Sequence, residues 1–498
     1  MQEVTNPSTH HVTAREDRIS IFQKVIYSIG GLVNNIQAAA LGSMVIVLNL
    51  GLGMNPALVG LIGAIPRIVD AISDPLVGYS SDNTRTRYGR RRPFIFFGAL
   101  SAGLLFALMF QLYNGHSDSF YFWYFLGFQV LFFIGFTCYS IPWIALGYEM
   151  TPDYHERTRL QGASNFVAQF AWVIAPWFFK IMNNKDMFTD IVHGARTLAL
   201  IIGAFIMVGG ILPAIFNKEK FGSLAKPERL KGLWNVMKDF FSGFAVALKC
   251  RPFVKICAAT FLIFNGFMLA SAFSAYVIFF YVYGGDYSKG GTLLGWFGSI
   301  SSVCTFCVIF LTTWISTKIG KRKTFLITIS LSIIGYALKW IGYNPDQPYL
   351  LLIAAPFIAF GLGSLFTLTG SMVADVCDLD ELQTGTRREG MFSAIYWWMV
   401  KLGLAVASLL SGILLNATGF NVALGAGQTA QTLLYMRICD IGIPIIASIA
   451  AIFIIMTFKI SEAKAYDIRN QIERRREERR SEARRGEERR REARRGEA

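Results

Sequence analysis

The sequence predicts an all-α polytopic membrane protein with twelve transmembrane helices in two six-helix pseudo-repeats. Hydrophobic residues make up 53% of the 498 positions and charged residues only 16%, which is far from the balance of a soluble globular protein. Twelve apolar runs reach the length of about 20 residues that a helix needs to cross a bilayer. Short basic motifs also recur between the two halves of the chain.

The apolar runs divide the chain into five parts. In chain order the runs lie at 22–49, 57–80, 93–113, 120–146, 163–183, 196–216, 253–283, 291–316, 324–343, 349–374, 391–416 and 434–458. We therefore expect an N-terminal segment (1–21), a first six-helix half (22–216), a basic linker (217–252), a second six-helix half (253–458) and a charged tail (459–498). From about Asp467 the tail has almost no apolar residue and cannot bury a core of its own.

The connections between spans carry an internal repeat. Gly89 to Arg92 recurs as Gly320 to Lys323, an offset of 231 residues, and Arg159 to Gly162 recurs as Arg387 to Gly390, an offset of 228. Two motifs in nearly the same register indicate two homologous halves. Parallel repeats of six spans are the major facilitator architecture, in which substrate binds near the midplane between halves that rock against each other.

The basic residues are distributed unevenly across the predicted membrane. Forty of the 48 lysines and arginines lie at the termini or in the connections of one side. By the positive-inside rule this side is the cytoplasm, so both termini are predicted to be cytoplasmic and the protein to be integral to the plasma (inner) membrane. The net charge of +15 then fits contact with membrane lipid and requires no nucleic acid. We expect a monomer.

Three ionisable residues interrupt the second apolar run. Arg67, Asp70 and Asp74 follow an i, i+3, i+7 spacing, which places all three on one face of a helix. Each buried charge costs on the order of 3 kcal/mol to insert, so the two carboxylates need compensation. The candidates are a bound metal cation, a shared proton, Arg67 itself or a cation from another helix. A purely structural salt bridge with Arg67 is the alternative.

Other charged residues lie within the later spans. Ten residues of helix from Met391 place Lys401 about 15 Å deep, near the midplane. A lysine there either takes part in function or occupies a polar cavity in a paired or neutral form. Lys339 is predicted to extend toward the external interface, and Arg437 with Asp440 to form a local pair.

Several functional classes lack their motifs. No GxxxxGK[ST] phosphate loop occurs, so ATP-driven transport is not indicated. The seven cysteines and five histidines form no metal-ligand cluster, and the Cys304 to Cys307 pair lies inside a predicted span. No nucleophile with a base is evident. We therefore expect no enzyme, no metal site and no cofactor, and a protein driven by an ion gradient or acting as a passive facilitator.

Two blocks of sequence resemble a known family. The run from Asp70 to Gly78 followed by the arginine-rich stretch to Pro93, and the block from Ala374 through Gly390 to Gly403, are similar to the signatures of the glycoside–pentoside–hexuronide cation symporters, with melibiose permeases among them. The likeness extends from Phe22 to Lys459. It implies a major facilitator fold and symport of a sugar or glycoside with Na⁺, H⁺ or Li⁺.

The resemblance also implies roles for individual residues. Asp70 and Asp74 match the family's cation-binding carboxylates, and Thr137 matches a hydroxyl near that cation. Lys401 matches a lysine that links the cation and sugar sites, and Arg67 is expected to act with it in coupling. Asn35, Ser140 and Asn165 replace charged residues of the melibiose permeases, which argues against melibiose as the substrate. Asn35 is expected beside both cation and substrate.

Amides, hydroxyls and aromatic rings of the central helices form the expected substrate site. Its candidates are Asn34, Asn35, Gln37, Tyr139, Trp143, Asn165, Gln169, Tyr396 and Trp397. The alternative is that most of them pack between helices. Gating is expected from ion pairs that close the cytoplasmic face. The gating candidates are Asp82, Arg90, Arg91, Glu149, Arg387 and Glu381.

The predicted function is cation-coupled symport of a pentoside, hexuronide or oligosaccharide by alternating access. One alternative is a symporter of lysophospholipid or another amphiphile on the same fold, which the 42 phenylalanines favour. The other alternative is a transport-silent sensor or scaffold that recruits a partner through its charged tail.

Overall fold

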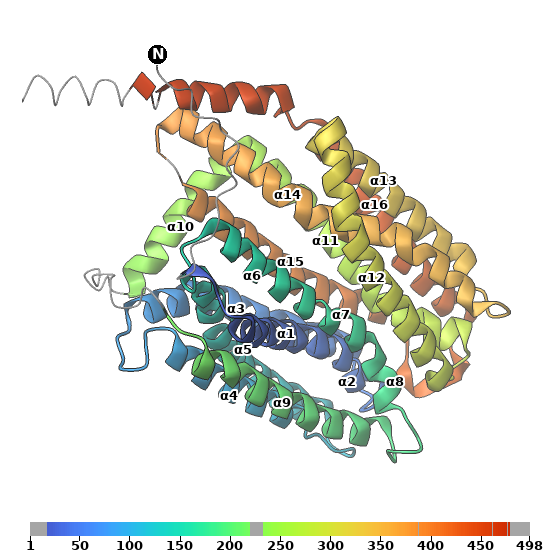
Figure 1. Cartoon of the computed structure of the whole chain (residues 1–498). Coiled ribbons are helices and arrows are strands. Elements are labelled where there is room, and N and C mark those ends of the chain that lie inside the picture. Colours follow the sequence, from blue (N-terminus) through green and yellow to red (C-terminus); the bar gives the residue numbers. More distant parts are fainter. Residues whose placement is uncertain (1–16, 220–232, 387, 461, 476, 479–498) are drawn as a thin grey trace, which may run out of the picture.

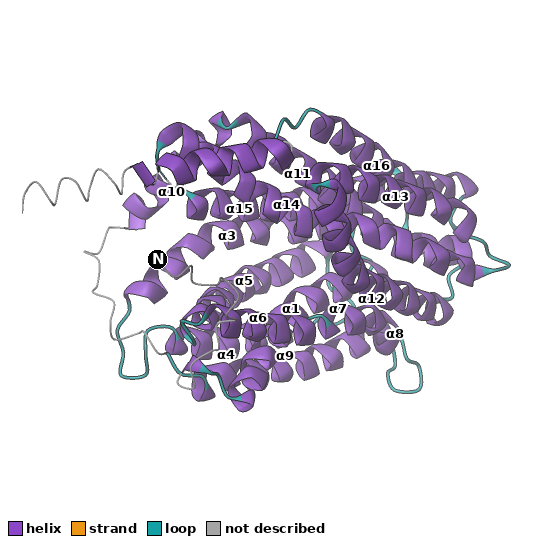
Figure 2. Cartoon of the chain, turned by 45° about the horizontal axis from the view of Figure 1, so that its top comes forward, coloured by secondary structure: helices purple, strands orange, loops and turns teal. Residues whose placement is uncertain are grey.

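The computed structural model describes residues 17–219, 233–386, 388–460, 462–475 and 477–478. In these residues twelve helices are long and apolar enough to cross a membrane, which confirms the predicted number of spans. The N-terminal helices, blue to green, pack beside the C-terminal helices, yellow to red (Figure 1). The described residues form helices and loops, without β-strands (Figure 2).

The first half contains six spans, of which two are built from several helical pieces. They are α1 (Ile21–Met44) with α2 (Val47–Leu50), α3 (Pro56–Asn83), α4 (Arg92–Met109), α5 (Asp118–Glu149), the segmented span α6 (Tyr154–Ala168), α7 (Phe170–Ile174), η2 (Ala175–Trp177) and α8 (Phe178–Met182), and α9 (Ile191–Phe216).

The helix α10 (Leu233–Lys249) leads from the linker into the second half. The spans there are α11 (Arg251–Tyr276) with the π-helical turn η3 (Val277–Val282), α12 (Tyr287–Ile319), α13 (Lys321–Gly342), η4 (Pro348–Ile353) with α14 (Ala354–Thr384), α15 (Glu389–Ala417), and α16 (Ala430–Met456) after the short η5 (Val422–Gly427). We call the face where α1 begins and α16 ends the terminal face, and the other the distal face.

The helices begin where side chains can satisfy the free backbone N–H groups of a first turn. Ser20 Oγ accepts from the Gln23 N–H at 3.2 Å, and Asn55 Oδ1 accepts from the Ala57 N–H at 2.9 Å. Asp190 and Asp286 cap α9 and α12 in the same way. The helix α14 runs to Thr384, ten residues past the predicted end of its apolar run, because backbone hydrogen bonding continues after the helix leaves the apolar layer.

The sequence repeat has a structural counterpart in the backbone. Gly89 precedes α4 with φ of +108°, and Gly320 precedes α13 with φ of +84°. Both values lie in the left-handed region, where a side chain would be strained and glycine is not. The repeated glycine and its basic neighbours therefore form equivalent turns in the two halves.

The two halves pack most closely where α3 crosses α15. A Cβ added to Gly60 would lie 2.7 Å from the Ser408 carbonyl oxygen, and one added to Gly412 would lie 2.3 Å from the Pro56 carbonyl oxygen. Such backbone approach is possible only between small residues. The two helices run antiparallel, so ten or eleven residues from this crossing, about 16 Å along each axis, Asp70 of one half meets Lys401 of the other.

Further contacts join the halves between the midplane and the distal face. Trp177 Nε1 donates to Ser299 Oγ at 2.8 Å, and the Tyr276 hydroxyl donates to Asn49 Oδ1 at 3.1 Å. Phe179 stacks on Phe279 with ring centroids 4.4 Å apart. These contacts close the distal side of the interface between the halves.

A buried ion pair joins three helices of the second half. Lys339 of α13 and Asp440 of α16 lie 2.6 Å apart, with side chains 1% and 0% exposed. Lys339 Nζ also donates to Ser274 Oγ of α11 at 2.7 Å, and the Tyr343 hydroxyl donates to Asp440 Oδ2 at 2.7 Å. Both charges are therefore hydrogen-bonded as well as paired.

This arrangement corrects two predictions. Lys339 does not extend to an interface, because Ser332, Gly335 and Tyr336 place its face of α13 toward the core. Asp440 pairs with Lys339 and not with Arg437. The Arg437 guanidinium lies instead 4.2 Å from the ring centroids of both Tyr281 and Trp340.

Removal of one partner of the buried pair should be strongly destabilising. We expect Lys339→Met to lower the free energy of unfolding by about 3–5 kcal/mol, because it leaves the Asp440 charge buried alone. The double variant Lys339→Met with Asp440→Leu should recover at least half of that loss. Reversible unfolding in mixed micelles measures both values.

Lys289 is the matched control, because its pair with Asp286 is exposed. Lys289→Met should change stability by less than about 1 kcal/mol. A loss in Lys339→Met no larger than in Lys289→Met would contradict the structural role of the buried pair.

Candidate functional site

Four charged side chains meet near the middle of the interface between the halves. Lys401 Nζ lies 2.5 Å from Asp74 Oδ2 and 2.9 Å from Asp70 Oδ2, so one ammonium from α15 bridges two carboxylates of α3. Asp70 is 1% exposed, whereas Asp74 and Lys401 are 25% and 23% exposed. The compensating cation is therefore supplied by the other half of the molecule.

Two hydroxyl groups complete the oxygen cluster. Thr137 of α5 donates to Asp70 Oδ1 at 3.0 Å and lies 3.4 Å from Asp74 Oδ1. Ser73 Oγ lies 3.1 Å from Thr137 Oγ1 and 3.0 Å from the Asp70 carbonyl oxygen. Ser73 was not among the predicted site residues, although its position three residues after Asp70 places it on the same side of α3.

Proline shapes α3 at this level. Pro75 directly follows Asp74 inside the helix and has no N–H, so the Ala71 carbonyl lacks its usual helical donor. Pro66 has the same effect one residue before Arg67. The charged turn of α3 therefore lies between two points where the helix is weakened and carbonyl oxygen is freed.

Arg67 is the fourth member of the cluster. Its Nη1 atom lies 3.9 Å from Asp70 Oδ2, and its guanidinium carbon lies 4.6 Å from the centroid of the Phe133 ring. The separation from Asp70 exceeds hydrogen-bond distance. Arg67 thus balances charge in the cluster while its N–H groups form no hydrogen bond to another described residue.

The oxygen cluster has the chemistry of a site for a small hard cation. Carboxylate and hydroxyl oxygens suit Na⁺, Li⁺ or a proton better than a soft metal. Lys401 Nζ now occupies the position from which both carboxylates can be reached. A cation bound there would replace the ammonium, because the two positive charges compete for the same oxygen atoms.

The predicted substrate residues occupy several environments. Tyr139 is fully buried and donates to the Gly30 carbonyl oxygen at 2.9 Å. Trp143 stacks on Tyr27 with centroids 4.9 Å apart and lies over Gly30, where a Cβ would meet its Nε1 atom at 2.5 Å. The structure places both residues in packing between α5 and α1.

Some side-chain amide atoms of α1 lack hydrogen-bond partners among the described residues. Asn35 Nδ2 donates to the Ala168 carbonyl oxygen at 3.2 Å and so ties α1 to the end of α6. Gln37 is fully buried, and neither its amide nitrogen nor its amide oxygen has a hydrogen-bond partner among the described residues. The Asn34 Oδ1 atom is likewise buried without a partner there.

The remaining candidates lie on α15 and around the end of α6. Tyr396 is buried, and its hydroxyl lies 2.7 Å from Thr369 Oγ1. Trp397 is 53% exposed and stacks on Phe366 with centroids 5.8 Å apart. Asn165 is exposed and Gln169 is half-buried at the junction of α6 and α7.

The predicted gating residues pair within the first half. Arg90 and Arg91 both reach Glu149 Oε1, with a distance of 2.8 Å for Arg91, and Arg91 lies 2.9 Å from Asp82. These contacts join α3, α4 and α5 to one another. Arg387 lies outside the described residues, and Glu381 lies on the last turn of α14.

Equivalent pairs occur in the second half. Lys321 lies 2.7 Å from Asp375, and Arg388 lies 2.6 Å from Asp380. In both halves these pairs connect neighbouring helices of the same bundle. In this conformation they stabilise each half at the terminal face and do not bridge the halves.

Glu219 is a residue of this face that sequence reasoning missed. Its carboxylate accepts the backbone N–H groups of Arg90, Arg91 and Arg92 at 2.9, 2.9 and 3.0 Å and so caps α4. In return the Arg92 guanidinium donates to the Ala214 and Ile215 carbonyl oxygens at the end of α9. No local sequence signal connects positions so far apart.

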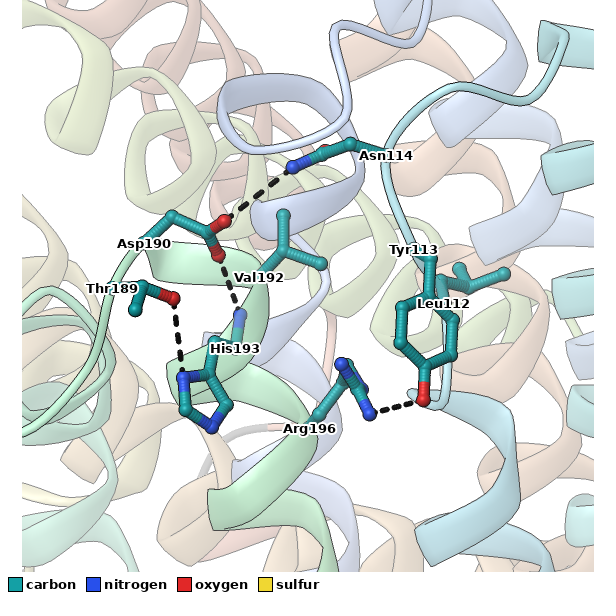
Figure 3. Close-up of a pocket in the computed structure, with 8 residues that line it drawn as sticks. All are labelled: Leu112, Tyr113, Asn114, Thr189, Asp190, Val192, His193 and Arg196. Carbon is teal, nitrogen blue, oxygen red and sulfur yellow. Dashed lines mark hydrogen bonds between the residues drawn. The ribbon is translucent and has the colours of Figure 1, made fainter.

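A pocket on the distal face lies away from these groups. It is formed in the first half by the loop after α4 and the start of α9 (Figure 3). Asp190 accepts hydrogen bonds from the Asn114 amide and from the backbone N–H of His193, and so caps α9. Arg196 donates to the Tyr113 hydroxyl. These hydrogen bonds hold the loop, whereas Arg196 Nε is buried without a hydrogen-bond partner among the described residues.

Comparisons with known proteins cover nearly the whole chain. A family model described as MFS/sugar transport protein matches residues 26–462. The chain is 24% identical to the isoprimeverose transporter of Lactiplantibacillus pentosus, over 82% of each chain. It is 23% identical to the glucuronide carrier protein homolog of Escherichia coli, over 91% of this chain and 95% of the relative.

A further relative carries a different name. The chain is 24% identical to the sodium-dependent lysophosphatidylcholine symporter 1 of Mus musculus, over 93% of this chain and 90% of the relative. Among solved structures, the xylose transporter XylE of E. coli in a partially occluded inward-open conformation superposes with a TM-score of 0.58. It shares 15% identity and is covered over 98% of its length, with 89% of this chain.

The glycine crossing between α3 and α15 should be essential for closing the distal face. In a variant whose native cysteines are replaced, we expect a cysteine at the buried Ser299 position to be protected from a membrane-impermeant maleimide. Gly60→Leu should raise its labelling rate at least fivefold, because the larger side chain forces the halves apart.

Gly127→Leu is the matched control, since no atom lies within 4 Å of a Cβ added there. It should leave the labelling rate unchanged. Equal protection in the Gly60 and Gly127 variants would show that the crossing does not hold the distal face closed.

Proposed function

The chain belongs to the MFS/sugar transport protein family, and from this premise we propose that it is a cation-coupled symporter of a sugar or glycoside. Its relatives include symporters and carriers of sugars and glycosides, and the twelve apolar helices make it an integral membrane protein. Transport in this fold proceeds by alternating exposure of a central site between the halves. We assign the terminal face to the cytoplasm by the positive-inside rule, because forty of the 48 basic residues belong in sequence to the termini or to the connections of one predicted side.

A single observation supports cation coupling most strongly. Lys401 of one half bridges Asp70 and Asp74 of the other half, in the place where a cation would bind. When the cation binds, the ammonium is displaced and becomes available to the substrate. Cation and substrate then favour each other, and the coupling must be reciprocal: each raises the affinity of the other by the same factor.

We assign the cation to Asp70, Asp74 and Thr137, with Ser73 behind them, and the coupling to Arg67 and Lys401. Substrate is assigned to the space beside Lys401. Trp397 on α15 offers an exposed ring face. The unpartnered amide atoms of Gln37 and Asn34 are buried in this conformation and would reach sugar hydroxyls only after the helices rearrange. The cation is Na⁺ or H⁺.

A lysophospholipid substrate is the second candidate. The chain has the same sequence identity, 24%, to the mouse lysophosphatidylcholine symporter and to the isoprimeverose transporter. A thermal-shift screen of glycosides against lysolipids, with and without Na⁺, separates the two. Stabilisation by a lysolipid and by no glycoside would decide for the second candidate.

Loss of the Asp70 carboxylate should abolish coupling. In proteoliposomes we expect Asp70→Asn to reduce Na⁺-stimulated uptake of the identified glycoside at least tenfold, because the cation loses its most buried ligand. Asp346→Asn, at an exposed loop carboxylate, should retain uptake. Unchanged cation stimulation in folded Asp70→Asn would exclude this residue from the cation site.

The competing ammonium leads to a prediction of opposite sign. Lys401→Gln should tighten cation binding by on the order of tenfold, equivalent to about 1.4 kcal/mol, because both carboxylates lose their internal partner. Uphill uptake should be lost in the same variant. Isothermal titration with Na⁺ measures the affinity, and weaker binding would refute the competition between Lys401 and the cation.

A further inference from the structure

The span made of α6, α7, η2 and α8 is interrupted twice, and the first joint lies between α6 and α7. There the Trp172 N–H donates to the Gln169 carbonyl oxygen, three residues back, at 3.1 Å. The Ala168 carbonyl thereby loses its usual helical donor and accepts from Asn35 Nδ2 of α1 at 3.2 Å. Backbone groups without a partner are costly within a membrane. The first joint is therefore completed by a side chain of its own half.

The second joint lies at η2 and is caused by Pro176, which has no N–H to donate. In an α-helix the donor to the Trp172 carbonyl would be residue 176, four residues on. In the 3₁₀ turn that η2 forms, the donor to the Val173 carbonyl would be residue 176 as well, three residues on. Two neighbouring carbonyl oxygens must therefore be satisfied from outside the span.

Two serines of α12 satisfy them. Ser302 Oγ donates to the Trp172 carbonyl oxygen at 3.0 Å, and Ser299 Oγ donates to the Val173 carbonyl oxygen at 2.8 Å. Ser299 Oγ also accepts from Trp177 Nε1 at 2.8 Å. The helix α12 lies beside α7 and α8 in both views (Figure 1, Figure 2). Since α12 belongs to the second half, the second joint is completed only across the interface between the halves.

The surface of α12 is shaped to receive this joint. A Cβ added to Gly295 would lie 2.7 Å from the Trp177 ring, and one added to Gly298 would overlap the Pro176 ring. Ser299 and Ser302 follow Gly295 by four and seven residues, so all three lie on one face of α12. The glycines allow the close approach, and the serine hydroxyls then reach the freed carbonyls. This fit exists only while the halves are closed on the distal side.

We propose that Ser299 and Ser302 form a carbonyl clamp, which holds the distal face closed and sets how often it opens in the absence of any ligand. When the halves separate on the distal side, both hydroxyls withdraw, and water must take their place on the Trp172 and Val173 carbonyls. The clamp therefore favours the distal-closed conformation. This inference goes beyond the proposed function and depends on neither the substrate nor the cation.

Distances between loops of the distal face measure the clamp. Ser119 of the first half and Asp346 of the second half are exposed there and can carry nitroxide labels in a variant whose native cysteines are replaced. Double electron–electron resonance in nanodiscs, without ligand, then gives the distribution of their separation. Ser299→Ala and Ser302→Ala should each raise the longer-distance population roughly fivefold, which is the effect of one net hydrogen bond.

Thr313→Ala is the matched control. Thr313 is an exposed hydroxyl residue of the same helix, but it donates to the Ile309 carbonyl oxygen of α12 itself at 2.7 Å. Its loss should leave the distance distribution unchanged, and Ser302→Thr, which keeps the hydroxyl, should do the same. Unchanged distances in the serine-to-alanine variants, or an equal shift in Thr313→Ala, would refute the clamp.

Pro176→Ala tests whether the serine acts through the freed carbonyl. The alanine supplies the missing N–H, so the Trp172 carbonyl gains a donor within its own span. In this background Ser302→Ala should lose most of its effect on the distances. A full fivefold effect there would show that Ser302 does not act by capping the carbonyl.

Monodisperse elution and a cooperative melting transition show that each variant is folded. Ser302 is half-buried, whereas Ser299 is 8% exposed and has two hydrogen-bond partners. Ser302→Ala therefore decides the test if Ser299→Ala does not fold. Because no ligand is added, a failure to find sugar transport would leave this result unchanged.

Discussion

The bridge from Lys401 to Asp70 and Asp74 is the constraint on which the arrangement of the two halves depends. Two carboxylates one helical turn apart repel each other, and near the midplane they have little water to screen them. Their compensating ammonium lies on a different half, so neutrality of the first half requires the second. The close approach of α3 and α15 at Gly60 and Gly412 brings the two helices near enough for this bridge to form.

The protein contains a second ion pair, Lys339 with Asp440, which differs from the central cluster in its burial and hydrogen bonding. Lys339 and Asp440 are almost fully buried, and Ser274 and Tyr343 fill their remaining hydrogen-bonding positions. Such a pair has no room for another ion and holds three helices of one bundle together. Asp74 and Lys401, by contrast, each retain about a quarter of their exposure. The central pair is therefore partly open to solvent, whereas the peripheral pair is not.

The sequence predicted the spans well because hydropathy is a local property. For the two carboxylates it left a cation from another helix as one of four possible partners, and Lys401 was linked to them by its similar depth and by the family resemblance. It failed for Lys339, although Ser332, Gly335 and Tyr336 at helical spacing already marked that face as buried. The prediction for Lys339 relied on its place near the end of the span and did not use the helical spacing of the residues before it. Glu219 and the pairing of Arg90 and Arg91 within their own half depend on tertiary contacts, which no local pattern records. Tyr139 and Trp143 were predicted from residue type, which does not distinguish a pocket from packing against Gly30.

The strengths of the contacts between the halves indicate which of them a ligand must control. The distal face is held by single neutral hydrogen bonds, such as that between Tyr276 and Asn49, each with a net value of about 1 kcal/mol, and by packing of small residues. The strong ion pairs of the terminal face lie within the halves, so rocking need not break them. Among the ion pairs between residues that the structure describes, the bridge of Lys401 is the one that spans the halves. Under the proposed function, a cation that competes for those two carboxylates would act on this charged link between the halves, and this would explain how so small a ligand can bias the position of two large helical bundles.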